Sequence, residues 1–192
     1  MNTHELVLPV SDHQVDTLHV GDTVYLSGIV CTGRDMGHLE LKKLIDNKQP
    51  LPVNFKGGAV FHAGPVTMKK DKGWELRVIG PTTSIRMEPH ADWVGELGVK
   101  IIIGKGGMGE KSLKAFARHK QVYLQAAPGC AVMLASGVKK VLDVFWLEKG
   151  MPEAMWVLEV EHFGPFVVTM DAHEHSRYAE VKTMAMDYIN KR

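Results

Sequence analysis

Short apolar stretches alternate along this chain with stretches in which apolar residues recur at helical spacing. Apolar and β-branched residues dominate 24–30, 59–62, 74–79 and 99–103, which is typical of strands. By contrast, 36–45 has apolar residues at helical spacing, namely Met36, Leu39, Leu41, Leu44 and Ile45, and that pattern predicts a helix. The chain therefore combines both kinds of element.

The rest of the chain completes this pattern. We expect further strands at 6–10, 122–124, 141–147, 155–160 and 166–170, and further helices at 91–97, 110–119, 131–137 and 174–189. The first half is rich in strands and the second alternates strand with helix, which predicts an α/β fold of layered mixed sheets with helices on one face. The sequence shows no internal repeat and no long linker, so we expect a single domain over residues 1–192.

Composition and charge narrow the function classes. The formal net charge is +1, which argues against a nucleic-acid partner. The first residues lack the pattern of a signal peptide, and no apolar run approaches the roughly 20 residues of a membrane span. Only two cysteines occur, Cys31 and Cys130, so we expect no disulfide framework and a reducing, cytoplasmic location.

The richest candidate chemistry lies in segment 80–87, which reads Gly-Pro-Thr-Thr-Ser-Ile-Arg-Met. It combines the hydroxyls of Thr82 and Thr83 with the guanidinium of Arg86. A hydroxyl both donates and accepts hydrogen bonds, and a guanidinium presents a planar fork that fits a carboxylate. The segment therefore suits a small carboxylic acid, unless the hydroxyls only satisfy the backbone of their own turn.

Two more glycine-containing segments carry a cation. Segment 33–38 reads Gly-Arg-Asp-Met-Gly-His and contains Arg34; segment 104–109 reads Gly-Lys-Gly-Gly-Met-Gly and contains Lys105. A glycine loop before a helix lets a lysine and backbone N–H groups approach an anion. The alternatives are a helix start capped by Asp35, with a surface ion pair, and a tight turn with a solvated lysine.

Segment 104–109 also has the glycine spacing of a dinucleotide-binding turn. The acidic residue that such a site needs at the end of the next strand is missing, and Gln125 stands there instead. As a phosphate loop the segment is flawed as well, because Glu110 occupies the lysine position. Nucleotide binding through 104–109 is thus a minor alternative.

Taken together, these segments resemble the beta subunit, or C-terminal half, of the iron–sulfur hydro-lyases, which include class I fumarate hydratase and L(+)-tartrate dehydratase. The resemblance runs from about residue 20 to residue 165 and is carried most specifically by segments 80–87 and 104–108. Further matching pieces are Leu26-Ser27-Gly28, Phe61-His62-Ala63-Gly64-Pro65, Pro128-Gly129-Cys130-Ala131 and Gly150-Met151-Pro152-Glu153. His62, the Gly-Cys pair and the Met-Pro-Glu run are most similar to the tartrate dehydratase subunit.

The resemblance implies a swivelling β/β/α domain that contributes half of an active site. A cluster usually takes three or four thiolates, so two cysteines far apart in sequence cannot hold one in this chain. The expected 4Fe-4S cluster would belong to a separate alpha subunit, in a heterodimer or heterotetramer, and no metal site is expected in this chain.

The family's site roles carry over to matching positions. By resemblance, Thr82 moves a proton at the substrate carbon. We expect Asp35 to orient Arg34 or to cap the helix, and His38 and His62 either support the site or only pack in the core. The residues that would bind the carboxylates of a hydroxy-dicarboxylate substrate are Arg34, Thr83, Arg86 and Lys105. The competing hypotheses are a non-catalytic scaffold or binding domain and a nucleotide-binding enzyme.

Overall fold

The computed structural model describes residues 1–190 of the chain. Its strands are β1 (Thr3–Val7), β2 (Thr23–Thr32), β3 (Ala59–Phe61), β4 (Ala63–Lys70), β5 (Gly73–Pro81), β6 (Ile101–Gly104), β7 (Val122–Gln125), β8 (Val138–Phe145) and β9 (Met155–Met170). Its α-helices are α1 (Asp12–Asp16), α2 (Asp35–Asp46), α3 (Ala91–Glu96), α4 (Glu110–His119), α5 (Ala131–Ser136) and α6 (Arg177–Asn190). Two 3-10 helices, η1 (Ser84–His90) and η2 (Leu147–Lys149), complete the list.

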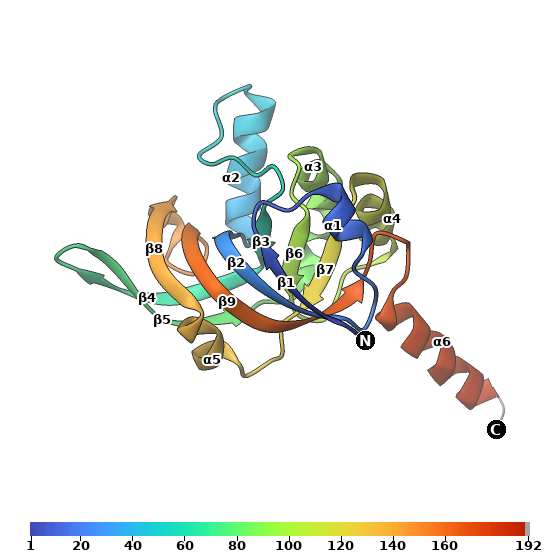
Figure 1. Ribbon diagram of the computed structural model, residues 1–192. Coiled ribbons are helices and arrows are strands. Elements are labelled where there is room, and N and C mark those ends of the chain that lie inside the picture. Colours follow the sequence, from blue (N-terminus) through green and yellow to red (C-terminus); the bar gives the residue numbers. More distant parts are fainter. Residues whose placement is uncertain (191–192) are drawn as a thin grey trace.

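The main sheet closes on itself through β9. Its strand order is β1-β2-β3-β6-β7-β9-β8, and β9 pairs in addition with β2 (Figure 1). Strands β1, β2, β3, β6 and β7 are parallel, whereas β9 runs antiparallel to its partners. One side of β9 follows β2, and its other side pairs first with β8 and then with β7. Strands β2, β3, β6, β7 and β9 thus form a closed ring.

Alternation along the strands divides the apolar residues into two cores. In β6, Ile101 and Ile103 belong to one core and Ile102 to the other, because successive side chains point to opposite faces. The first core contains three phenylalanines that meet edge to face, at positions 61, 163 and 166. The second core lies beneath α2, α3 and α4, so these helices cover the outer face of the ring.

Two elements extend from this body. Strands β4 and β5 form a separate two-stranded sheet, and α5 packs against β5. Helix α6 projects away from the ring (Figure 1) and has no buried residue. Within residues 1–190, no helix has both the length and the apolar character needed to cross a membrane.

The structure confirms the α/β class and most of the expected elements. The separation of 155–160 from 166–170 was wrong, because both belong to β9. The Gly164-Pro165 step lies where β9 changes partner from β8 to β7, while its bonding to β2 continues.

Three other expectations need correction. The first strand spans Thr3–Val7 and not 6–10, since its register with β2 starts at Thr3. Helix α1 and strand β4 were not expected. The apolar pattern of β4 is weak because residues 68–70 at its outer end are exposed.

Replacement of Phe166 by Ala tests the first core. Phe166 is fully buried and lies 5.1 Å from Phe163 and 6.2 Å from Phe61, measured between ring centroids. We expect the free energy of unfolding to fall by about 3–5 kcal/mol in urea titrations. The exposed control Val132→Ala should change it by less than about 0.5 kcal/mol, and equal effects of the two variants would contradict this account of the core.

Candidate functional site

The candidate residues gather at one rim of the ring. In a parallel sheet the carboxyl ends of neighbouring strands lie at the same edge. Arg34 and Asp35 follow β2, His62 follows β3, and Lys105 follows β6. Thr82 follows β5, and its backbone N–H donates to the carbonyl of His62 at 2.7 Å. The topology therefore brings together the segments that the sequence analysis singled out.

Arg86 links two of these segments. Its Nη2 lies 2.8 Å from Asp35 Oδ2 and donates to Thr82 Oγ1 at 3.1 Å. The expectation that Asp35 orients Arg34 or caps α2 was wrong. Asp35 is the first residue of the helix, pairs with Arg86, and follows an N-cap residue, Arg34, that makes no side-chain capping bond.

Arg34 is held by Glu153, to which the sequence analysis assigned no role. Arg34 Nη2 lies 3.0 Å from Glu153 Oε1, and the backbone N–H of Met36 donates to Glu153 Oε2 at 3.1 Å. One carboxylate thus fixes the guanidinium and caps α2. Gly64 leaves room for it, because a Cβ there would lie 2.7 Å from Arg34 Nη1. The Met-Pro-Glu run was the available sequence signal for Glu153.

Lys105 lies beside the threonine pair through backbone contacts. Its N–H donates to the carbonyl of Thr82 at 3.3 Å, and the N–H of Ser84 donates to the carbonyl of Lys105 at 3.1 Å. Thr83, directly between them in sequence, is exposed. No carboxylate of residues 1–190 forms an ion pair with Lys105, whereas Arg34 and Arg86 each have one. Lys105 is therefore the site cation that keeps its charge available for a ligand.

The start of α4 is occupied by a side chain of the protein itself. Glu88 accepts hydrogen bonds from the N–H of Gly109 and, at 3.1 Å, from Ser112 Oγ. A carboxylate suits this position because a helix N-terminus carries partial positive charge. A Cβ at Gly109 would lie 2.5 Å from Glu88 Oε2. Since Glu88 fills the place where a nucleotide phosphate would bind, the geometry argues against nucleotide binding through 104–109.

Two buried histidines, His38 and His62, form hydrogen bonds to the segments of the rim. The N–H at Nδ1 of His38 donates to the carbonyl of Arg34 at 2.8 Å. His62 Nδ1 lies 2.9 Å from Ser84 Oγ, which also accepts from the hydroxyl of Tyr123 at 2.9 Å. His38 thus contacts the backbone that carries Arg34, and His62 contacts the segment that carries the threonines.

Burial keeps these histidines neutral. It lowers the pKa of His38 to about 4 and holds the pKa of His62 well below its usual value. The ring centroid of His38 lies 5.4 Å from that of His62 and 5.2 Å from that of His90, whose pKa is also lowered by burial. These rings therefore support the site without adding positive charge at neutral pH.

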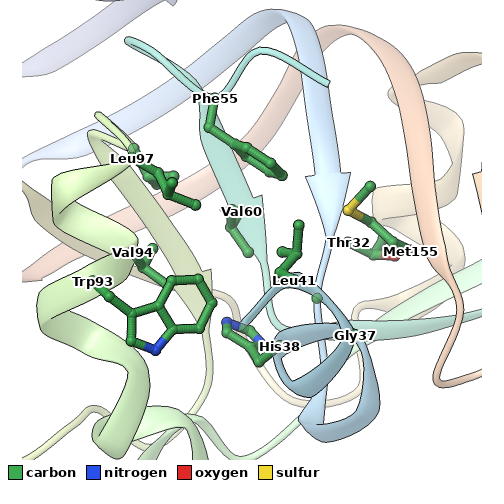
Figure 2. Close-up of a pocket in the computed structure, with 12 residues that line it drawn as sticks. Thr32, Gly37, His38, Leu41, Phe55, Val60, Trp93, Val94, Leu97 and Met155 are labelled. Carbon is green, nitrogen blue, oxygen red and sulfur yellow. The ribbon is translucent and has the colours of Figure 1, made fainter. Parts of the chain in front are cut away.

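Figure 2 shows a cavity that is lined in part by His38. It lies between α2, α3 and the outer face of the ring and is lined mainly by apolar side chains, among them Leu41, Phe55, Val60 and Val94. His38 is the one ionisable residue among the described residues that line it. A dicarboxylate would find no partner for its charges there, so this cavity is not the candidate substrate site.

The thiols do not fit a metal cluster. Within residues 1–190 no three His, Cys, Asp or Glu side chains are placed to hold a metal ion. Cys31 is buried, and burial raises its thiol pKa to about 12, so it stays protonated. The thiol of Cys130 donates to the carbonyl of Ala127. A cluster would need more thiolates than this chain offers.

The neutral state of His38 predicts a pH dependence of stability. The unfolded chain protonates this histidine near pH 6.5, but the folded chain does so only near pH 4. Acid therefore favours unfolding, and His38 alone should lower the free energy of unfolding by about 2 kcal/mol between about pH 7 and about pH 5. His38→Gln should flatten this dependence in urea titrations, and the exposed control His13→Gln should leave it unchanged. Equal slopes for His38→Gln and the unmodified chain would contradict the assignment.

Comparison with known proteins gives the family. The family described as "Fumarase C-terminus" matches residues 2–181. L(+)-tartrate dehydratase subunit beta of Escherichia coli (strain K12) is 39% identical over 180 residues, which cover 93% of this chain and 88% of the relative. A putative subunit of the same name from Methanocaldococcus jannaschii is 41% identical over 179 residues and 92% of each chain. A putative class I fumarate hydratase of Geobacillus stearothermophilus is 41% identical over 188 residues, 97% of this chain and 35% of that protein. This chain therefore belongs to the fumarase C-terminus family.

Proposed function

We propose that this chain is the beta subunit of an iron–sulfur hydro-lyase that dehydrates a small hydroxy-dicarboxylate. Relatives named as tartrate dehydratase beta subunits and as a class I fumarate hydratase support the reaction class. The observation that carries the proposal is the meeting of three cations and two threonines at one rim, with Lys105 unpaired among residues 1–190. L(+)-tartrate, which would give oxaloacetate, and malate, which would give fumarate, are the candidate substrates.

In this proposal the cations bind the two carboxylates of the substrate. Arg34 and Arg86 keep their guanidiniums in place through Glu153 and Asp35, and each guanidinium has further N–H donors for a ligand. Lys105, in segment 104–109, adds a positive charge that no carboxylate of residues 1–190 balances. Each charge-assisted hydrogen bond contributes roughly 1.5–3 kcal/mol, and Thr83 adds a neutral donor. Several such bonds fix the substrate's orientation at the rim.

Thr82 is the proposed proton-transfer residue. Dehydration moves a proton from one carbon to a base, the C–H electron pair forms the new double bond, and hydroxide leaves the adjacent carbon. Thr82 Oγ1 already accepts a hydrogen bond from Arg86, whose positive charge favours a negatively charged oxygen at that position. A free threonine hydroxyl is a weak base, so a carboxylate of the alpha subunit would take its proton first.

The alpha subunit completes the site in this proposal. It would carry the 4Fe-4S cluster, since the two thiols of this chain do not fit one. We assign no step of the reaction to a metal in this chain. A heterodimer or heterotetramer would place the partner over the rim, opposite Thr82 and Lys105.

The first functional prediction separates a shared site from a scaffold. We expect the isolated chain to be folded and inactive in anaerobic assays with tartrate, malate and fumarate. Turnover should appear only when the alpha subunit is added, because that subunit supplies the cluster and the carboxylate that activates Thr82. Turnover by the purified chain alone would contradict the shared site, and a chain that fails to support turnover with any cluster-bearing alpha subunit would favour the scaffold hypothesis.

A second prediction separates the roles of the two threonines. In the assembled enzyme, Thr82→Val should lower kcat and kcat/KM together by roughly 10²- to 10⁴-fold, because it removes a group that acts in the transition state. Thr83→Val should mainly raise KM, by roughly 5- to 20-fold, because its bond exists before and during the reaction. Thr183→Val, on exposed α6, is the matched control and should have no effect. Normal kcat with raised KM in Thr82→Val would make Thr82 a binding residue.

A further inference from the structure

The loop that carries Lys105 has little means of holding its own shape. Gly106 and Gly107 adopt φ values of +79° and +71°, a region that side-chain-bearing residues rarely occupy. Glycines have no side chains to pack, so the conformation of the loop depends on contacts from other elements. Lys105 itself is fixed to the threonine segment by its backbone.

Gln125, the last residue of β7, holds the turn. Its Oε1 accepts a hydrogen bond from the N–H of Gly106 at 3.1 Å and a second from the hydroxyl of Tyr178 at 2.5 Å. Its Nε2 donates to the carbonyl of Ala126 at 3.1 Å, which fixes the orientation of the amide. Gln125, which stands where a dinucleotide site would have an acidic residue, thus binds the backbone of the glycine loop.

Tyr178, in the first turn of α6, supports the same loop from a second direction. Its hydroxyl accepts from Thr169 Oγ1 at 3.2 Å in addition to donating to Gln125. Its ring covers Gly107 so closely that a Cβ at this glycine would lie 2.2 Å from Tyr178 Cε2. Gly106 is therefore held by its hydrogen bond to Gln125, and Gly107 is covered by the ring of Tyr178.

We propose that Gln125 and Tyr178 are positioning residues that hold the glycine loop in the conformation that presents Lys105 to the substrate. This inference rests on the proposed function, in which Lys105 binds a substrate carboxylate. Neither side chain needs to touch the substrate. Their effect on the reaction passes through Lys105, and that dependence distinguishes them from residues that only stabilise the fold.

The test is a double-mutant cycle in the assembled alpha–beta enzyme, assayed anaerobically with whichever of L(+)-tartrate, malate and fumarate it turns over fastest. Lys105→Ala should lower kcat/KM by roughly 10- to 100-fold. Gln125→Met keeps the length of the side chain and removes the acceptor; we expect it to lower kcat/KM by roughly 5- to 10-fold, mainly through KM. Tyr178→Phe keeps the ring over Gly107 and should have a smaller effect of the same kind.

The decisive value is the effect of Gln125→Met when Lys105 is already Ala. If Gln125 acts through Lys105, the kcat/KM of the double variant should match that of Lys105→Ala within about twofold. Once Lys105 is Ala, its contact with the substrate is already absent, so Gln125→Met has nothing further to weaken. Gln49→Met, an exposed position outside the site, is the control and should leave kcat/KM unchanged.

Three results would overturn the inference. A Gln125→Met effect that multiplies with Lys105→Ala, or no effect of Gln125→Met beside a strong effect of Lys105→Ala, would contradict the positioning role alone. If Lys105→Ala retains full kcat/KM, the proposed role of Lys105 is wrong and the positioning role falls with it.

Discussion

The pairing of β9 with β2 closes the ring and thereby organises the rest of the fold. It runs from Thr23 opposite Val167 to Cys31 opposite Val157 and joins the last strand of the sheet to one of the first. The closed ring gives the phenylalanine core an enclosed interior and leaves an outer face for α2, α3 and α4. Within this ring, the parallel pairing of β2 with β3 and of β3 with β6 places the segments that follow these strands at one rim.

The chemistry of that rim follows from how its charges are balanced. Arg34 and Arg86 each face a carboxylate, which keeps two guanidiniums in place at the rim without a ligand. Lys105 has no such partner among residues 1–190, and the buried histidines are neutral at pH 7 because desolvation lowers their pKa. A dianionic ligand would therefore meet an oriented site with one unbalanced positive charge. This arrangement supports the proposal that the chain binds carboxylates and leaves metal chemistry to a partner.

Much of this arrangement was predictable from local sequence, and its couplings were not. Arg34, Thr82 and Lys105 could be identified as site residues because each lies in a short segment that combines glycine with a cation or with hydroxyl groups. Contacts between residues that are far apart in the sequence cannot be predicted from short motifs. The bond of Glu153 to Arg34 spans more than a hundred residues, and the contact of Gln125 with the glycine loop requires that β7 lie beside β6. For the same reason β9 was taken for two strands, since only its continuous partner β2 shows that it is one.

A crystal structure of the alpha–beta complex with a bound dicarboxylate would show directly whether this rim binds the substrate. We expect one substrate carboxylate to lie within hydrogen-bonding distance of Lys105 Nζ, and the guanidiniums of Arg34 and Arg86 to point toward the ligand. Thr82 Oγ1 should face the carbon that loses its proton. A ligand bound entirely by the alpha subunit, with Lys105 directed to solvent, would contradict this expectation.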